Sequence, residues 1–205
     1  MTGLAEKWTE RSFIAGNQVL DFLNTQGGDT KARDLERLNT YWDILTWAVA
    51  AEVLNAEECG VLGDLAVRRP DLAQHCLQEL RIQRESLYRL ITSTMSGDTP
   101  AESDRSSVEM NFRSALQHAR LIPGVSQPAR WYSVADEAGL SLVQCRLAIA
   151  ASTLITDVAS QNIRQCETCS WLFMDSSATK RRRWCSMAVC GNRAKAQRHY
   201  HRNKH

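Results

Sequence analysis

The sequence contains no long hydrophobic run. No stretch of its 205 residues approaches the roughly 18 consecutive apolar residues that a membrane-spanning helix needs. Residues 1–11 alternate polar and charged side chains where a signal peptide would place an apolar segment. We therefore expect a cytoplasmic protein with no membrane partner.

Proline and glycine are also scarce, with 4 prolines and 10 glycines. Fibrous and low-complexity proteins are rich in these residues, so both classes are excluded. With 43% hydrophobic and 23% charged residues, the composition is that of a globular protein. A chain of this length can form one ordinary core and still carry an appended module.

Charge is distributed unevenly along the chain, although the net charge is only +2. Residues 164–205 contain ten Lys or Arg and two acidic residues, a net charge of +8, so residues 1–163 carry −6. A basic segment joined to an acidic body is typical of a binding module for an anionic partner, although a solvated basic tail would look the same.

Four of the seven cysteines follow the spacing Cys166-x2-Cys169-x15-Cys185-x4-Cys190. In a cytosolic chain such a cluster favours a metal over disulfides, because that compartment keeps thiols reduced. Two such pairs provide the tetrahedral thiolate shell that zinc prefers, and four protein ligands leave no position for water. We expect one structural Zn²⁺ per chain; an iron–sulfur cluster or free thiols are the alternatives.

Apolar residues recur at helical spacing through the first 160 residues. Capping or turn signals precede the candidate helices, at Asn39-Thr40, Asn55, Pro70 and Thr99-Pro100. The helix after Pro100 is expected to end before Pro123, and the last one, 140–158, to lead straight into the cysteine cluster. Residues 131–134 suit one short strand or an irregular turn. The other three cysteines, Cys59, Cys76 and Cys145, lie on apolar helix faces and are expected to be buried.

Basic residues lie between and after the two cysteine pairs. Those expected to contact nucleic acid are Lys180, Arg181, Arg182, Arg183, Arg193, Lys195, Arg198 and Arg202. At 100° per residue, Lys195, Arg198 and Arg202 project from one side of a helix. One or two arginines would suffice to neutralise the zinc thiolates, so the surplus suits phosphate contacts.

The cysteine segment resembles the CGNR zinc finger family, named for Cys190-Gly191-Asn192-Arg193. The similarity includes Phe173-x-Asp175 and residues 183–187, whereas the loop 175–180 departs from the form expected in that family. Residues 13–164 are similar to the ABATE domain usually found with this finger, through Leu20-Asp21-Phe22-Leu23-Asn24-Thr25 and Arg33-Asp34-Leu35. The resemblance implies a bacterial DNA-binding transcription regulator.

Together these features predict a mainly α fold in two domains. Residues 1–163 would form a helical domain with room for a short strand pair, and residues 164–205 a finger made of a knuckle, a loop and a basic helix. In the helical domain, polar side chains near an apolar helix are candidates to bind a small-molecule effector: Asn17, Asp21, Asn24 and Arg33. Helix capping, turn bonding or simple surface exposure explains the same residues. Homodimerisation is the other role considered for this domain.

Three classes of function compete. The leading hypothesis is a transcription regulator that binds DNA through the finger. The alternative is a module for RNA or for another protein, because phosphate attraction is common to DNA and RNA. An enzyme is not expected, and we assign no catalytic residue, since the sequence has no Ser-His-Asp order, no phosphate loop and no paired carboxylates at metal-binding helical spacing.

Overall fold

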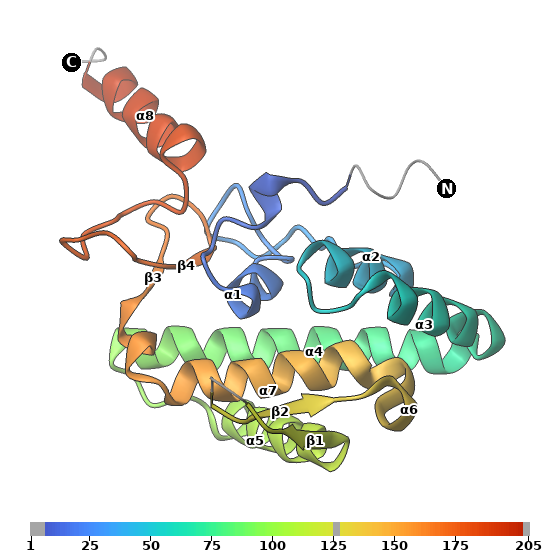
Figure 1. Cartoon of the computed structure of the whole chain (residues 1–205). Coiled ribbons are helices and arrows are strands. Elements are labelled where there is room, and N and C mark those ends of the chain that lie inside the picture. The colour runs from blue at the N-terminus through green and yellow to red at the C-terminus, as the bar shows by residue number, and fades with distance from the viewer. Residues whose placement is uncertain (1–6, 125–127, 203–205) are drawn as a thin grey trace. The chain divides into compact units, whose positions relative to one another are not determined.

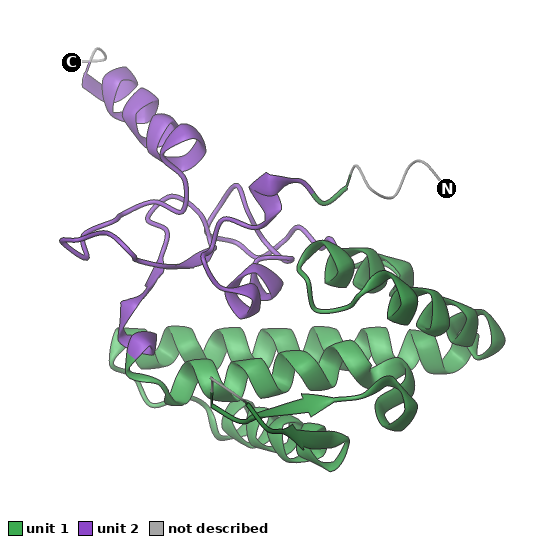
Figure 2. Ribbon diagram, viewed as in Figure 1, with its two compact units in different colours: residues 1–8, 38–158 green, residues 9–37, 159–205 purple. Residues whose placement is uncertain are grey.

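The structure is a computed structural model that describes residues 7–124 and 128–202 (Figure 1). The chain divides into two compact units, each built from two separate stretches (Figure 2). The helical unit comprises Met1–Trp8 and Leu38–Val158, and the cysteine unit comprises Thr9–Arg37 and Ala159–His205. Along the sequence, the helical unit is thus inserted between the two parts of the cysteine unit. Independent folding of residues 1–163 stays a prediction.

Helices dominate the helical unit, as the sequence predicts. They are α2 (Tyr41–Ala50), α3 (Ala56–Arg68), α4 (Pro70–Ser96), α5 (Glu102–Gln117), α6 (Ala135–Ala138) and α7 (Leu142–Thr156). Capping boxes begin α2 and α3, formed by Thr40 with Asp43 and by Asn55 with Glu58. Pro70 occupies the first turn of α4, and Gly97 ends that helix in the left-handed conformation that glycine adopts readily.

The core of the helical unit forms around α7, which packs against α5, α4 and α2. Cys145 lies in this core with Ala115 and Ala148, and Cys76 is also buried, while Cys59 is half-buried. By length and composition alone, the stretch 135–156 could span a membrane, but half of its apolar part is buried inside the structure. Core helices of folded domains pass the same test.

Two predicted helices end earlier than their apolar pattern indicates. The helix after Pro100 ends at Gln117, and Ala119–Ile122 forms strand β1, paired antiparallel with β2 (Arg130–Ser133). A pairing between two separate segments is invisible to local periodicity, which explains the difference. The last helix ends at Thr156, because Asp157 takes an extended backbone conformation. A short 3₁₀ segment, Val158–Asn162, then precedes the cysteine cluster.

The cysteine unit combines both ends of the chain. Its N-terminal part contains a 3₁₀ turn, Glu10–Ser12, and helix α1 (Gln18–Leu23). Its C-terminal part contains the antiparallel strands β3 (Ile163–Gln165) and β4 (Leu172–Met174), a π-helical turn η4 (Met187–Gly191) and helix α8 (Asn192–Arg202). Helix α1 lies against β4, and five apolar residues of these two elements are fully buried: Leu20, Phe22, Leu23, Leu172 and Phe173.

Candidate metal centre and basic surface

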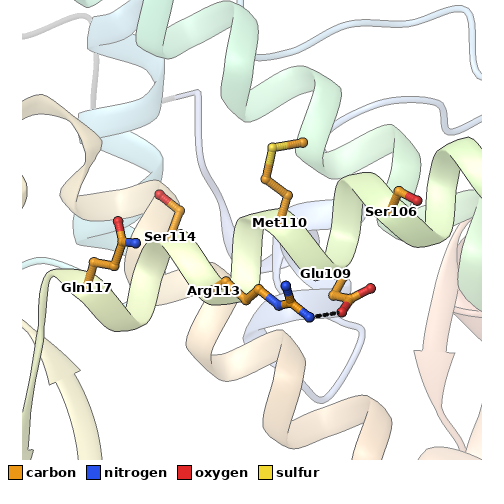
Figure 3. Close-up of a pocket in the computed structure, with 6 residues that line it drawn as sticks. All are labelled: Ser106, Glu109, Met110, Arg113, Ser114 and Gln117. Carbon is orange, nitrogen blue, oxygen red and sulfur yellow. Dashed lines mark hydrogen bonds and ion pairs between the residues drawn. The ribbon is translucent and has the colours of Figure 1, made fainter.

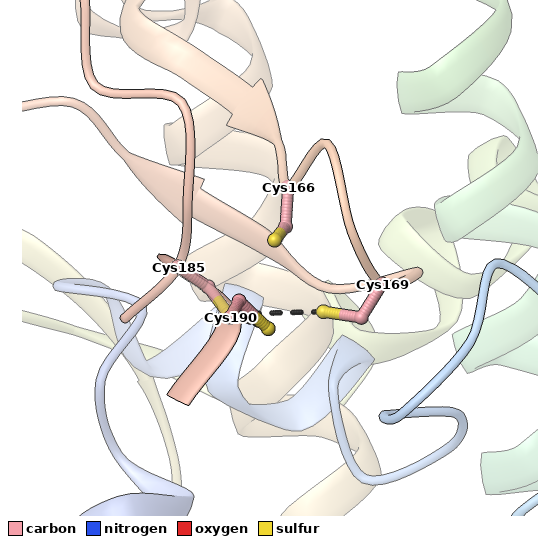
Figure 4. A group of neighbouring side chains, drawn as sticks. All are labelled: Cys166, Cys169, Cys185 and Cys190. Carbon is pink, nitrogen blue, oxygen red and sulfur yellow. Dashed lines mark hydrogen bonds between the residues drawn. The ribbon is translucent and has the colours of Figure 1, made fainter. Parts of the chain in front are cut away.

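The four predicted ligands meet at one place in the cysteine unit (Figure 4). Their Sγ atoms all lie within 4.8 Å of one another, and all four residues are buried. The Sγ of Cys185 is 3.7 Å from that of Cys169 and 3.6 Å from that of Cys190. Sulfur atoms placed tetrahedrally at ~2.3 Å from zinc are about 3.8 Å apart. The cluster therefore has the size and chemistry of a structural Zn²⁺ site with four thiolate ligands.

Local backbone structure brings the two cysteine pairs together. The first pair lies in the turn between β3 and β4, which is closed by a 2.9 Å bond from Cys166 N to the Trp171 carbonyl. The second pair is held by η4, where Gly191 N donates to the Ser186 carbonyl at 3.0 Å. A single π-helical turn of this kind often marks a functional site, and here it carries the ligand Cys190.

The thiols also interact electrostatically. Hydrogen bonds with Cys169 and Cys185 lower the pKa of the Cys166 thiol, whereas bonds with Cys166 and Cys169 raise the pKa of Cys185. The thiolate, not the thiol, is the form that binds zinc. Because zinc binding requires deprotonated ligands, affinity for the metal is expected to fall at acid pH.

All four residues of Cys190-Gly191-Asn192-Arg193 contribute to the centre. Cys190 supplies a ligand, and Gly191 leaves room for Met187, whose Sδ would lie 2.6 Å from a Cβ at that position. Asn192 Nδ2 donates to the Ala188 carbonyl at 3.1 Å, which joins η4 to α8. Arg193 Nη2 lies 3.2 Å from Cys190 Sγ, and its Nη1 lies 3.4 Å from a carboxylate oxygen of Asp29.

Several of the predicted nucleic-acid contacts have partners inside the cysteine unit. Lys180 Nζ donates to the Asp175 carbonyl at 2.9 Å. Arg182 donates to the Trp184 and Cys185 carbonyls and stacks on Phe173, with its guanidinium carbon 4.5 Å from the ring centre. Arg183 forms a two-point ion pair with Glu167, at 2.6 and 2.5 Å. These cations build the loop between the cysteine pairs, and their contact with nucleic acid stays a prediction.

The remaining predicted cations face solvent. Arg181 and three residues of α8 are exposed, and among the described residues none of them forms an ion pair. The three helix residues, Lys195, Arg198 and Arg202, are here called the α8 stripe. Together with Ala196 and His199 they line a shallow groove on α8. No residue of α8 is buried, and residues 195–202 are all exposed.

The four candidate effector-binding residues all belong to the cysteine unit and are engaged with backbone groups. Asn17 caps α1 by accepting from Val19 N at 2.8 Å, and Arg33 Nη2 donates to the Leu23 carbonyl at 2.9 Å. Asp21 accepts from Ala15 N at 2.9 Å; burial raises the pKa of this carboxyl to about 6, an effect opposed by that hydrogen bond. Asn24 bonds to β4. Binding of an effector by these residues stays a prediction.

A second hollow lies on the outer face of α5 (Figure 3). It is lined by Ser106, Glu109, Met110, Arg113, Ser114 and Gln117, all from one helix. Glu109 and Arg113 form an ion pair across one helical turn, and Met110 is 65% exposed. This is an open surface on a single helix, unlike the enclosed clefts in which catalytic groups converge.

Sequence reasoning missed the contribution of residues 27–37 to the metal centre. Lys31 Nζ donates to the Cys166 carbonyl, and the guanidinium of Arg37 lies 5.6 Å from the centre of the Trp171 ring. The only local signal was Gly27-Gly28, which reads as a helix stop. These contacts join residues more than 130 positions apart, so no spacing rule could find them.

The family comparisons agree with this geometry. No curated protein matches the chain. The model of the CGNR zinc finger matches residues 162–203, which include all four ligands. The ABATE model, described as "Putative stress-induced transcription regulator", matches residues 16–158. Because that match covers more than half of the sequence, the chain belongs to the ABATE family, and it carries a CGNR zinc finger with one structural zinc at its C-terminal end.

Proposed function

We propose that this protein is a cytoplasmic transcription regulator that binds duplex DNA through the α8 stripe. The supporting observation is that the basic residues predicted to contact nucleic acid fall into two groups with different surroundings. Those between the cysteine pairs mostly satisfy internal carbonyls and carboxylates, whereas Lys195, Arg198 and Arg202 project into solvent from one side of an exposed helix. Exposed cations of this kind suit phosphate oxygens, and the Arg198 guanidinium also donates from Nε to the Ala194 carbonyl of the same helix at 3.4 Å.

The shape of α8 favours DNA over RNA as the partner. The helix has 11 residues and is therefore roughly 16 Å long. The major groove of B-DNA, about 12 Å wide, admits an α-helix, whereas that of A-form RNA is too narrow to be read by side chains. RNA and protein partners remain the alternatives that the experiment must separate.

The helical unit is proposed to serve regulation. The family description motivates either a small-molecule effector or homodimer formation as the way in which this unit alters DNA binding. No enzymatic step is part of the proposal, since both matching families are described as regulator-like or zinc-binding.

The test is the salt dependence of DNA binding by the full-length protein. Changing Lys195, Arg198 and Arg202 together to Ala should flatten the slope of log affinity against log salt by about three, because each phosphate contact contributes roughly −0.9. Zinc content should not change, because none of the three touches a ligand. The probe is a mixed-sequence DNA duplex, with an RNA duplex of equal length at matched salt.

A matched control removes three cations from the helical unit. Arg105, Arg113 and Arg120 are exposed and pair with surface glutamates, so their replacement by Ala should leave the slope unchanged. Wild-type affinity and slope in the α8 triple variant would overturn the proposed surface. Preference for the RNA duplex would favour the alternative function instead.

A further inference from the structure

Residues 15–37, here called the N-terminal segment, contact the finger through Asn24. The Asn24 side chain forms hydrogen bonds with both the N–H and the carbonyl of one finger residue, Leu172. Its Nδ2 donates to the Leu172 carbonyl at 2.9 Å, and its Oδ1 accepts from Leu172 N at 2.9 Å. The Asn24 side chain is 2% exposed and Leu172 is fully buried. Two residues further along β4, Met174 N donates to the Ala15 carbonyl at 2.7 Å. The N-terminal segment therefore takes the place of a third strand along β4.

Further contacts connect the same segment to the residues around the metal ligands. Gly27 packs so tightly on Ser170, the residue after Cys169, that a Cβ on the glycine would lie 2.2 Å from the serine Oγ. Lys31 donates to the carbonyl of the ligand Cys166. Asp29 is 3.4 Å from Arg193, which in turn contacts Cys190 Sγ. Residues 27–31 thus reach both cysteine pairs.

Size explains why the finger needs this support. Domains shorter than about 40 residues seldom bury enough apolar surface to fold without a metal or another aid. Here Leu172 and Phe173 of β4 are fully buried and β4 packs against α1, so the finger shares its small core with the N-terminal segment. Its ligands are therefore fixed by contacts that lie outside residues 162–203.

We propose that residues 15–37 are a structural part of the zinc centre and that Asn24 is its principal positioning residue. Asn24 fixes β4, and β4 forms one side of the turn that carries Cys166 and Cys169. Zinc retention depends on this side chain, and order in residues 15–37 depends in turn on zinc. The proposal is independent of DNA binding.

The first test measures the rate at which the full-length protein transfers zinc to a chromogenic chelator. Asn24→Ala leaves two buried backbone groups of Leu172 without partners, so zinc release should accelerate by at least about tenfold. Asn24→Asp removes the donor to the Leu172 carbonyl and should also accelerate release. The control is Asn55→Ala, which removes a helix cap in the helical unit and should leave release unchanged. Wild-type release from both Asn24 variants would overturn the proposal.

The second test uses the wild-type chain and does not depend on any variant folding. Amide hydrogen exchange is compared with zinc bound and after zinc has been removed by a chelator. Peptides from residues 15–37 should lose protection together with those from 163–174, while α4 and α7 keep theirs. Unchanged protection of residues 15–37 after zinc removal would show that the segment folds without the metal centre and would overturn the proposal.

Discussion

Arg193 places Nη2 3.2 Å from the Sγ of Cys190, three residues earlier in the same motif. The sequence offered two roles for this arginine, contact with nucleic acid or neutralisation of the thiolates. The structure provides a geometry for the second role, because a guanidinium beside a zinc-bound thiolate offsets the negative charge of a four-cysteine site. The contact with Asp29 gives the same side chain a second anchor in the N-terminal segment.

Replacing Arg193 by Ala should weaken zinc retention. A hydrogen bond to a charged group contributes about 1.5 to 3 kcal/mol, and the side chain is 35% exposed, so we expect the low end of that range. Zinc dissociation should then be roughly tenfold faster, measured by transfer to a chelator. Arg193→Lys keeps the charge but loses the planar fork, and should give an intermediate rate.

The opposite outcome would also be informative for Arg193. If the Ala variant kept its zinc but lost about 1 to 3 kcal/mol of discrimination between a target and random DNA, the arginine would be a base-reading residue. The thiolate contact would then be incidental.

Two glycines with nearly equal φ provide a matched pair. Gly27 has φ +81° and Gly97 has φ +79°, so alanine at either position costs about 1 kcal/mol through backbone strain. Only Gly27 also faces Ser170, and a Cβ at Gly97 would meet nothing within 4 Å. Gly27→Ala should therefore speed zinc release several-fold, whereas Gly97→Ala should lower the melting temperature without affecting zinc. Equal zinc release from the two variants would show that the packing of Gly27 on Ser170 is unimportant.

Removing one of the zinc-binding cysteines should unfold the cysteine unit and leave the helical unit folded. Structural zinc contributes on the order of 10 to 16 kcal/mol in comparable fingers, so Cys169→Ser should lose the metal and unfold the cysteine unit. The helical unit contains its own core around α7 and should stay helical by circular dichroism. Unchanged zinc content in a Cys169→Ser, Cys190→Ser double variant would refute the ligand assignment.

Local sequence signals predicted the features that depend on short spacing. The ligands were identifiable because knuckle spacing and thiolate chemistry are local, and the starts of α2 and α3 because capping boxes involve residues three apart. A short strand pair was expected as a possibility and residues 131–134 as one of its strands, but the partner strand β1 was assigned to the end of a helix, since each strand is only four residues long and gains its hydrogen bonds from a distant partner.

The candidate site was only partly predictable for the same reason. Asn24 was interpreted as a turn residue or a ligand contact, because its partner Leu172 lies 148 positions away. The basic residues were all predicted to contact nucleic acid, yet Arg182 serves the loop carbonyls and Arg198 faces solvent on α8. Charge can be counted in a sequence, but the partner of each charge is fixed by tertiary structure.

The pair formed by Glu58 and Arg146 should make the helical unit sensitive to acid. Arg146 is 7% exposed, donates to both carboxylate oxygens of Glu58 and also binds the Val53 and Ser133 carbonyls. The hydrogen bonds from Arg146, opposed by partial burial, hold the pKa of Glu58 below its usual 4.5. Because the folded-state pKa is lowered, the stabilisation is present above about pH 4.5 and disappears as the pH falls through the folded-state value.

Glu58→Gln tests this relationship. It leaves the buried Arg146 without its counter-charge and should cost roughly 3 kcal/mol of unfolding free energy at pH 7. The difference from the parent protein should begin to shrink as the pH drops below about 4.5, where the carboxyl of the unfolded chain protonates, and should be lost below the lowered folded-state pKa, where the folded parent's carboxyl is neutral too. Urea unfolding followed by circular dichroism, in the Cys169→Ser background, measures this free energy without a contribution from zinc loss.

The control is Glu137→Gln, which breaks an exposed pair with Arg120 and should cost below about 1 kcal/mol of unfolding free energy. A Glu58→Gln penalty that stays constant from pH 7 to pH 3 would mean that the side chain stabilises the unit by packing rather than by its charge.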